Sequence, residues 1–196
     1  MKGRSTIKAL LLLPTLLSAQ HVAAAAPPVR SAPAEAKQFD FLIGQWELEV
    51  KPQAAGLAQR IHGVPEMLGT WKAWRALDGW GITDELRITD ESGNPRGLSH
   101  AVRMYAPTAR RWNVSTADVY RGTFQSSTAA WKDGNMTMTS SDTDSKGKTF
   151  MSRTRYFDIT PTSFRFQQER SFDEGVKWAQ TLSIEAKRIA AVAPRV

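Results

Sequence analysis

The feature that most constrains this chain is a regular alternation between turn signals and short segments in which every second residue is apolar. Turn signals such as Ser92-Gly93-Asn94 and Asp133-Gly134-Asn135 recur at a regular interval beyond Gly69. The segments between them are rich in Thr, Val, Phe, Tyr and Trp, which is typical of half-buried strands. Because no segment beyond the N-terminus shows a convincing helical period, we predict a meander of antiparallel strands.

Ten segments carry the strand pattern. They span residues 45–51, 69–77, 80–90, 98–105, 111–119, 123–131, 135–142, 148–158, 163–171 and 176–187. In an open, twisted sheet this many strands would leave edges that need protection, whereas closure removes those edges. The later connections are short, and a sandwich usually needs long crossovers. The predicted fold class is therefore all-β, an up-and-down antiparallel barrel of about ten strands.

The first residues have the features of an export signal. Lys2 and Arg4 precede an apolar run over residues 7–17, and small residues at 23–26 offer cleavage sites. The run is too short to span a bilayer as a helix, although a retained membrane anchor is the alternative. We expect a signal peptide over residues 1–26 and a periplasmic or secreted location in a bacterium after its cleavage.

Composition limits the rest of the chain to one domain. Residues 27–37 are rich in Pro and Ala and are expected to form a disordered linker, and residues 38–190 are expected to form a single barrel domain. The chain has no cysteine, so its stability must come from burial and hydrogen bonds. The net charge is +7, but acids and bases alternate along the chain, and we expect no nucleic-acid partner.

One connection is much longer than the others. Residues 52–68 join the first and second predicted strands through a partly apolar insert. This insert is a candidate lid over one end of the barrel. The equally good alternative is a surface loop packed by Leu57, Ile61 and Met67.

Period-two counting places polar side chains on apolar strand faces. Asp84 falls between Ile82 and Leu86, and the same count puts other polar or aromatic residues on inner faces. A buried neutral polar group without a partner costs about 2–7 kcal/mol, so such groups should meet each other, water or a ligand. We therefore predict a partly polar cavity with a ligand-binding site. The residues predicted to line it are Trp71, Asp84, His100, Gln168 and Trp178.

Two alternatives to this cavity stay open. An Asp84–His100 or a Gln168–Gln180 contact would make a satisfied buried network without any ligand. A register shift of one residue would turn any of these side chains outward.

The segment FDFLIGQWELEV, residues 39–50, resembles the opening of the lipocalin-like (calycin) barrels, in which a short helical turn precedes a Gly-x-Trp strand, here Gly44-Gln45-Trp46. The ordered set FDFLIGQW, TWKAWRALDGWG, MYAPTARRW and ITPTSFRFQQERSFDEGVKW is similar to a bacterial family of exported or cytosolic domains of unknown function. The similarity covers residues 38–187. It implies a barrel with a possible cavity and no known reaction. The alternation on residues 45–51 points Trp46 inward, where we expect it to plug the closed end, with ligand stacking as the alternative.

Signatures of chemistry are mostly absent from the sequence. The haem-binding nitrobindins resemble the opening motif, but no histidine follows His100, so haem is not expected. The segment at residues 142–147 begins like a calcium loop, yet Lys146 occupies a ligand position. His62 and His100 are well separated and no cysteine is present to complete a zinc site. We expect no metal and no cofactor.

The alternation also gives the strands a polar second face, as with Thr83, Glu85 and Arg87. An outer-membrane barrel needs an apolar band there, so membrane insertion is not expected. The leading hypothesis is an exported soluble barrel that binds a small apolar or amphipathic molecule, with its polar end near Asp84, His100 and Gln168. The alternatives are an isomerase-like or cyclase-like enzyme that uses Asp84 and His100 as an acid–base pair, and a filled barrel acting as a structural or interaction module.

Overall fold

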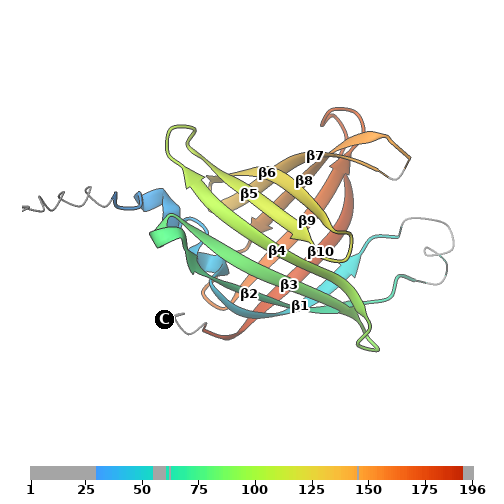
Figure 1. The fold of residues 1–196 in the computed structure, drawn as a ribbon. Coiled ribbons are helices and arrows are strands. Elements are labelled where there is room, and N and C mark those ends of the chain that lie inside the picture. Colours follow the sequence, from blue (N-terminus) through green and yellow to red (C-terminus); the bar gives the residue numbers. More distant parts are fainter. Residues whose placement is uncertain (1–29, 55–60, 62, 145, 192–196) are drawn as a thin grey trace, which may run out of the picture. The chain divides into compact units, whose positions relative to one another are not determined.

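The computed structural model of the protein describes residues 30–54, 61, 63–144 and 146–191. The expected signal peptide, residues 1–26, lies outside these residues, as do His62 and residues 55–60 of the long insert. The described part forms a closed β-barrel (Figure 1). Within it, no helix is long and apolar enough to cross a membrane.

Ten antiparallel strands form the barrel, as the sequence predicts. They are β1 (Gly44–Pro52), β2 (Met67–Ala76), β3 (Gly81–Asp90), β4 (Pro95–Ala106), β5 (Arg111–Asp118), β6 (Thr123–Lys132), β7 (Asn135–Thr143), β8 (Thr149–Phe157), β9 (Ser163–Ser171) and β10 (Ala179–Ala190). Each strand pairs with its neighbours in the chain, and β1 pairs with β10 to close the ring. The predicted up-and-down architecture is therefore confirmed.

Short 3₁₀ helices precede the first strand, also as predicted. They are η1 (Ala34–Lys37) and η2 (Asp40–Leu42), and a third, η3 (Leu77–Gly79), joins β2 to β3. The expected linker at residues 27–37 ends inside η1, where Ala36 is buried in the core. Order thus begins before residue 38, because a small alanine side chain packs against the barrel despite the polar composition around it. Figure 1 shows η1 and η2 at one end of the barrel.

Aromatic side chains fill this end of the barrel. Trp46 is fully buried, donates from Nε1 to the Leu42 carbonyl at 2.7 Å, and packs edge-on against Phe164 with ring centroids 4.8 Å apart. The Arg188 guanidinium carbon lies 4.1 Å from the Trp46 ring. Further buried rings complete the filling: Phe39, Trp71, Trp112 and Tyr156. The prediction that Trp46 closes one end is confirmed, and we call this the plugged end.

The Gly-x-Trp motif has a packing explanation. Gly44 has a φ of 143°, and a Cβ added there would lie 2.0 Å from Nη1 of Arg188. The glycine therefore leaves room for the guanidinium that covers Trp46. At the opposite end of the barrel, which we call the open end, lie the connections β5–β6, β7–β8 and β9–β10.

Candidate functional site

Trp71 and Asp84 meet inside the barrel, as predicted, but their third partner was not foreseen. Trp71 Nε1 donates to Oδ1 of Asp84 at 2.8 Å. Arg103 donates to the same carboxylate from Nε at 2.6 Å and from Nη2 at 3.2 Å. All three side chains are buried. The open alternative of a satisfied buried network is therefore correct for Asp84, with Arg103 in the place considered for His100.

Burial and charge oppose each other in this network. Burial alone would lower the pKa of Arg103, but its attraction to Asp84 and Tyr156 outweighs burial and raises that pKa. Burial also raises the pKa of Tyr156, although Arg103 acts in the opposite direction. At neutral pH the network thus holds a charged guanidinium beside an un-ionised phenol. The polar atoms of Trp71, Asp84 and Arg103 bond one another, so the network offers few free donors or acceptors to a ligand.

His100 lies on the outer face of the barrel, so its predicted inward orientation is wrong. On β4 the buried residues are Ala101, Arg103 and Tyr105, whereas the residues between them are half-buried or exposed. His100 Nε2 lies 2.8 Å from Oγ1 of Thr83, which also belongs to the outer face. The outer face of β4 is the more apolar of its two faces. For that reason the period-two alternation predicted it to be the inner face.

This placement also decides the enzyme hypothesis. Asp84 pairs with Ala101, and His100 pairs with Glu85, so Asp84 and His100 belong to opposite faces of the wall. Two groups on opposite faces of one sheet cannot act as an acid–base pair in one cavity. The hypothesis that these two residues catalyse a reaction inside the barrel is therefore wrong.

Trp178 is likewise on the outside. It precedes β10, and a bulge between Gln180 and Leu182 places Leu182 opposite the inner residue Gln168 but Gln180 opposite Glu169. The bulge reverses the alternation on which the prediction relied. The Trp178 ring lies 4.1 Å from the guanidinium carbon of Arg153, a residue of the outer face that bonds Glu169 at 2.9 Å.

Gln168 does face inward, as predicted. It lies opposite Thr154, which is buried, and its side-chain oxygen accepts a hydrogen bond from Oγ1 of Thr181 at 3.4 Å. The structure shows this contact in place of the one between Gln168 and Gln180 that was considered as an alternative. Of the predicted residues, Trp71, Asp84 and Gln168 are thus on the inner face, whereas His100 and Trp178 are not.

A hollow of about 760 Å³ lies at the open end, and we call it the chamber. Its walls come from β6 to β9 and from the β5–β6 and β7–β8 connections. The lining residues are Arg121, Thr123, Phe124, Gln125, Ser126, Ser141, Asp142, Thr143, Asp144, Phe150 and Arg170. A neighbouring hollow of about 390 Å³ shares Arg170 and includes Lys148, Phe172, Lys177 and Trp178.

Arg170 is the unpaired charge of the chamber. Its guanidinium carbon lies 4.5 Å from the centroid of the buried Phe150 ring. Its Nε is enclosed by protein and, among the described residues, has no hydrogen-bond partner, and no described carboxylate forms an ion pair with this side chain. Nε of Arg155 likewise lacks a hydrogen-bond partner among the described residues, but it lies 3.5 Å from Oε2 of Glu169, within ion-pair distance. Arg170 was missed by the sequence-based prediction. The period-two alternation that places Phe166 and Gln168 on the inner face also places Arg170 there, two residues later.

Two acids line the chamber, and both already accept hydrogen bonds. Asp142 accepts from Gln125 Nε2 at 3.0 Å through one oxygen and from the Thr143 backbone at 2.7 Å through the other. Asp144 accepts from the backbone N–H groups of Lys146 and Lys148, both at 2.9 Å. Neither acid forms an ion pair with Arg170. Over the residues that the structure describes, no three or more His, Asp or Glu side chains gather into a metal-binding group.

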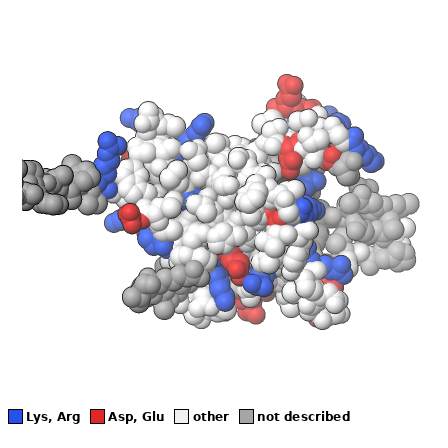
Figure 2. All heavy atoms as spheres, viewed as in Figure 1, with Lys and Arg blue, Asp and Glu red and all other residues white. Residues whose placement is uncertain are grey.

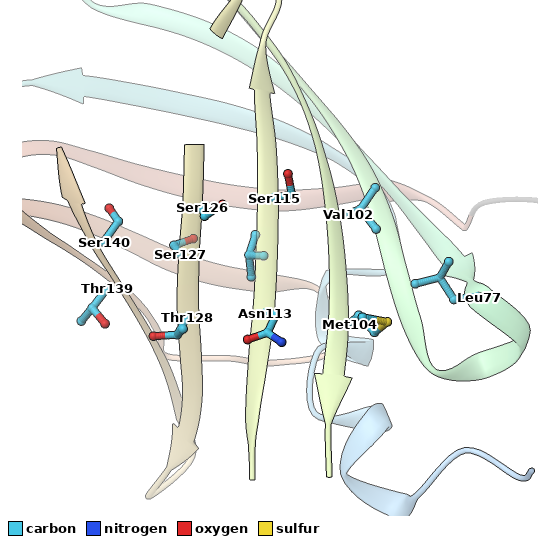
Figure 3. Close-up of a pocket in the computed structure, with 11 residues that line it drawn as sticks. Leu77, Val102, Met104, Asn113, Ser115, Ser126, Ser127, Thr128, Thr139 and Ser140 are labelled. Atoms are coloured by element: carbon cyan, nitrogen blue, oxygen red, sulfur yellow. The ribbon is translucent and has the colours of Figure 1, made fainter. Parts of the chain in front are cut away.

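A second large hollow lies on the outer face of the wall. This outer groove has a volume of about 630 Å³ and crosses β4 to β7 (Figure 3). Leu77, Val102 and Met104 supply its apolar part, and the rest of its lining is dominated by small polar side chains. These are Asn113, Ser115, Ser126, Ser127, Thr128, Thr139 and Ser140, with the buried Val114 beside them. The alternation predicts a polar outer face, and it gives no sign of this groove.

The class that the fold and hollows define is a ten-stranded up-and-down β-barrel, plugged by aromatic rings at one end and hollow at the other. No family model matches the sequence, and no curated protein matches it.

Comparison with solved structures finds chains of similar fold. An S-type phycobiliprotein lyase, CPES, from Guillardia theta aligns with a TM-score of 0.53 at 10% identity, over 77% of this chain and 90% of the other. A redesigned β-barrel, mFAP1, bound to DFHBI, aligns with a TM-score of 0.41 at 11% identity, over 78% and 99%. At these identities the likeness concerns the fold alone.

Proposed function

We propose that this barrel binds a small, mostly apolar molecule with one acidic group in the chamber at its open end. The single observation that carries the proposal is Arg170, a guanidinium that is enclosed at Nε and unpaired among the described residues, on the wall of a hollow of about 760 Å³. That volume lies within the range of about 300–1,000 Å³ that is usual for ligand sites.

The chemistry of Arg170 favours an acid as the polar end of the ligand. Withholding a hydrogen-bond partner from a partly buried guanidinium is unfavourable, and a carboxylate or sulfonate would supply one through charge-assisted bonds. The Phe150 ring lies against the guanidinium of Arg170 and also lines the chamber, where it adds apolar surface for the ligand body. The proposal keeps the small apolar or amphipathic ligand expected from the sequence but moves its polar end from Asp84 and His100 to Arg170.

The chamber also argues against a completely filled barrel. The plugged end is packed with rings, whereas several inner positions toward the open end carry short polar side chains, such as Ser127 and Ser140, beside the hollow. We further propose that binding takes place outside the cytoplasm, in the periplasm or the medium, because residues 1–26 have the features of an export signal.

The test uses two fluorescent probes that differ by one acidic group. 1-Anilinonaphthalene-8-sulfonate carries a sulfonate, and N-phenyl-1-naphthylamine lacks it. We expect saturable binding of both to the purified full chain. Arg170→Gln should weaken binding of the sulfonate probe about 10- to 100-fold, the usual loss when a charge-assisted hydrogen bond is removed, and should change the neutral probe little.

Arg165→Gln is the matched control, because Arg165 belongs to the same strand but is exposed and pairs with Asp158 at 3.3 Å. It should leave both affinities unchanged. Absence of saturable binding by either probe, or equal losses for both probes in Arg170→Gln, would overturn the proposal.

A further inference from the structure

We infer that the ligand is a single-chain amphiphile whose apolar tail leaves the barrel between β6 and β7 and lies in the outer groove. This inference rests on the proposed function, since it takes the acidic head to lie beside Arg170 in the chamber. It adds the substrate class and a second subsite, and it follows from the way in which two neighbouring strands separate.

β6 and β7 are paired over only half of their length. Their ladder runs from Lys132 opposite Asn135 to Thr128 opposite Thr139 and stops there. Both strands nevertheless continue toward the open end, where β6 stays paired with β5 and β7 stays paired with β8. Figure 3 shows the two strands close at their hairpin and diverging above Thr128 and Thr139. We call the unpaired stretch, residues 123–127 and 140–143, the seam.

The chamber and the outer groove meet at the seam. Ser126 borders both hollows. Ser127 and Ser140 border the outer groove, although their partners across the ladder, Val114 and Ser152, are buried residues of the inner face. Because Ser126 borders both hollows and the β6–β7 ladder has ended at this level, the two hollows adjoin at the seam.

Small side chains keep the seam open. The six residues where the strands part are serines and threonines: Ser126, Ser127, Thr128, Thr139, Ser140 and Ser141. Among the described residues, the side-chain hydrogen bond that crosses the seam is the one from Gln125 to Asp142 at 3.0 Å. A passage of this kind, hydroxyl-lined and crossed by one flexible side-chain bridge, fits a slender chain and not a rigid ring system.

The outer groove beyond the seam is suited to an apolar tail. Val102 and Met104 are 39% and 44% exposed, on strand faces that are usually polar, and Leu77 of η3 extends the apolar surface. Figure 2 shows the wall over β4 and β5 largely free of charged side chains, which gather toward the ends of the strands. Covering these side chains with methylene groups removes apolar surface on both sides from water.

The test compares octanoic acid, which is short enough to stay in the chamber, with hexadecanoic acid, whose tail must leave it. Calorimetric titration of the full chain should show tighter binding of hexadecanoic acid. Met104→Lys should weaken hexadecanoic acid at least 10-fold and leave octanoic acid within 2-fold. Ile189→Lys is the matched control, an exposed apolar residue near the end of β10 that does not line the groove, and it should change neither affinity.

Paramagnetic probes test the same placement in the unaltered protein. Stearic acid with a nitroxide at carbon 16 should broaden the Met104 methyl resonance, and the isomer labelled at carbon 5 should not. If neither fatty acid binds, the proposed function fails as well. If hexadecanoic acid binds and Arg170→Gln weakens it, but Met104→Lys has no effect and the carbon-16 label leaves Met104 sharp, only the tail placement is overturned.

Discussion

At the scale of single residues, the Asp84–Arg103 ion pair is the contact whose loss should cost the most stability. Both side chains are buried, and the carboxylate bonds to two donors, Arg103 and Trp71. Loss of one member of a buried ion pair leaves the other charge without compensation, which costs far more than the intact pair contributes. The pair therefore matters chiefly because removing either partner would leave an uncompensated charge inside the barrel.

Asp84→Asn should lower the free energy of unfolding by about 3–5 kcal/mol, because Arg103 would keep its charge in a buried place without a counter-ion. Denaturant unfolding followed by tryptophan fluorescence measures the change. Asp158→Asn removes an exposed carboxylate that pairs with Arg165 and should cost about 1 kcal/mol or less. Equal effects of the two substitutions would contradict the structural role given to Asp84.

Whether the inward or outward orientation of a side chain could be predicted depended on its neighbours in the sequence. Asp84 was placed correctly because Ile82 and Leu86 mark its face unmistakably. His100 was misplaced because the inner face of β4 carries Arg103, which made that face look like the polar, outer one. Hydropathy does not show that an arginine has a buried carboxylate partner, here Asp84 on β3. Trp178 was misplaced because a bulge in the following strand shifts the alternation, and bulges leave no reliable mark in the residues themselves.

At the scale of elements, turns fix the strands. Asp133 and Gly134 both adopt positive φ, 50° and 77°, as a two-residue hairpin between β6 and β7 requires. Such turn signals allowed all ten strands to be predicted to within a few residues of their ends. The seam was beyond prediction, because serines and threonines also occur in fully paired strands and do not mark where a ladder ends.

Gly44→Ala should destabilise the barrel by about 1–3 kcal/mol, since the new methyl group would displace Arg188 from its place over Trp46 at a backbone angle that favours glycine. A melting temperature several degrees lower is the expected observation. Gly122→Ala controls for backbone strain alone, because Gly122 has a φ of 65° and open space around it. A shift no larger than that of the control would show that Arg188 packing does not depend on this glycine.

At the scale of the whole molecule, the number of strands and the shortness of their connections were enough to predict closure. The division of the interior was not predictable, because it arises from which rings meet at the plugged end and which short side chains meet at the open end. The sequence indicated polar groups inside. It did not distinguish a satisfied network at Asp84 from an unpaired cation at Arg170.

We propose that export produces the working form of the protein. When the full chain is expressed in a bacterium, the periplasmic or secreted product should have an intact mass that begins near residue 26 or 27. Leu12→Arg, which interrupts the apolar run, should leave an uncut product in the cytoplasm. A full-length, uncut mass for the unaltered chain, recovered with the cytoplasmic fraction, would contradict the proposal.

The pairing of the first strand with the last has a consequence for how the molecule is made. Trp46 lies opposite Arg188, so the ring cannot close until nearly all of the chain has been synthesised. Contacts between such distant segments slow folding, and until β10 arrives the growing chain carries two unsatisfied strand edges. Any product of premature termination therefore lacks the strand that closes the barrel. We expect such a product to be degraded by proteases or to precipitate.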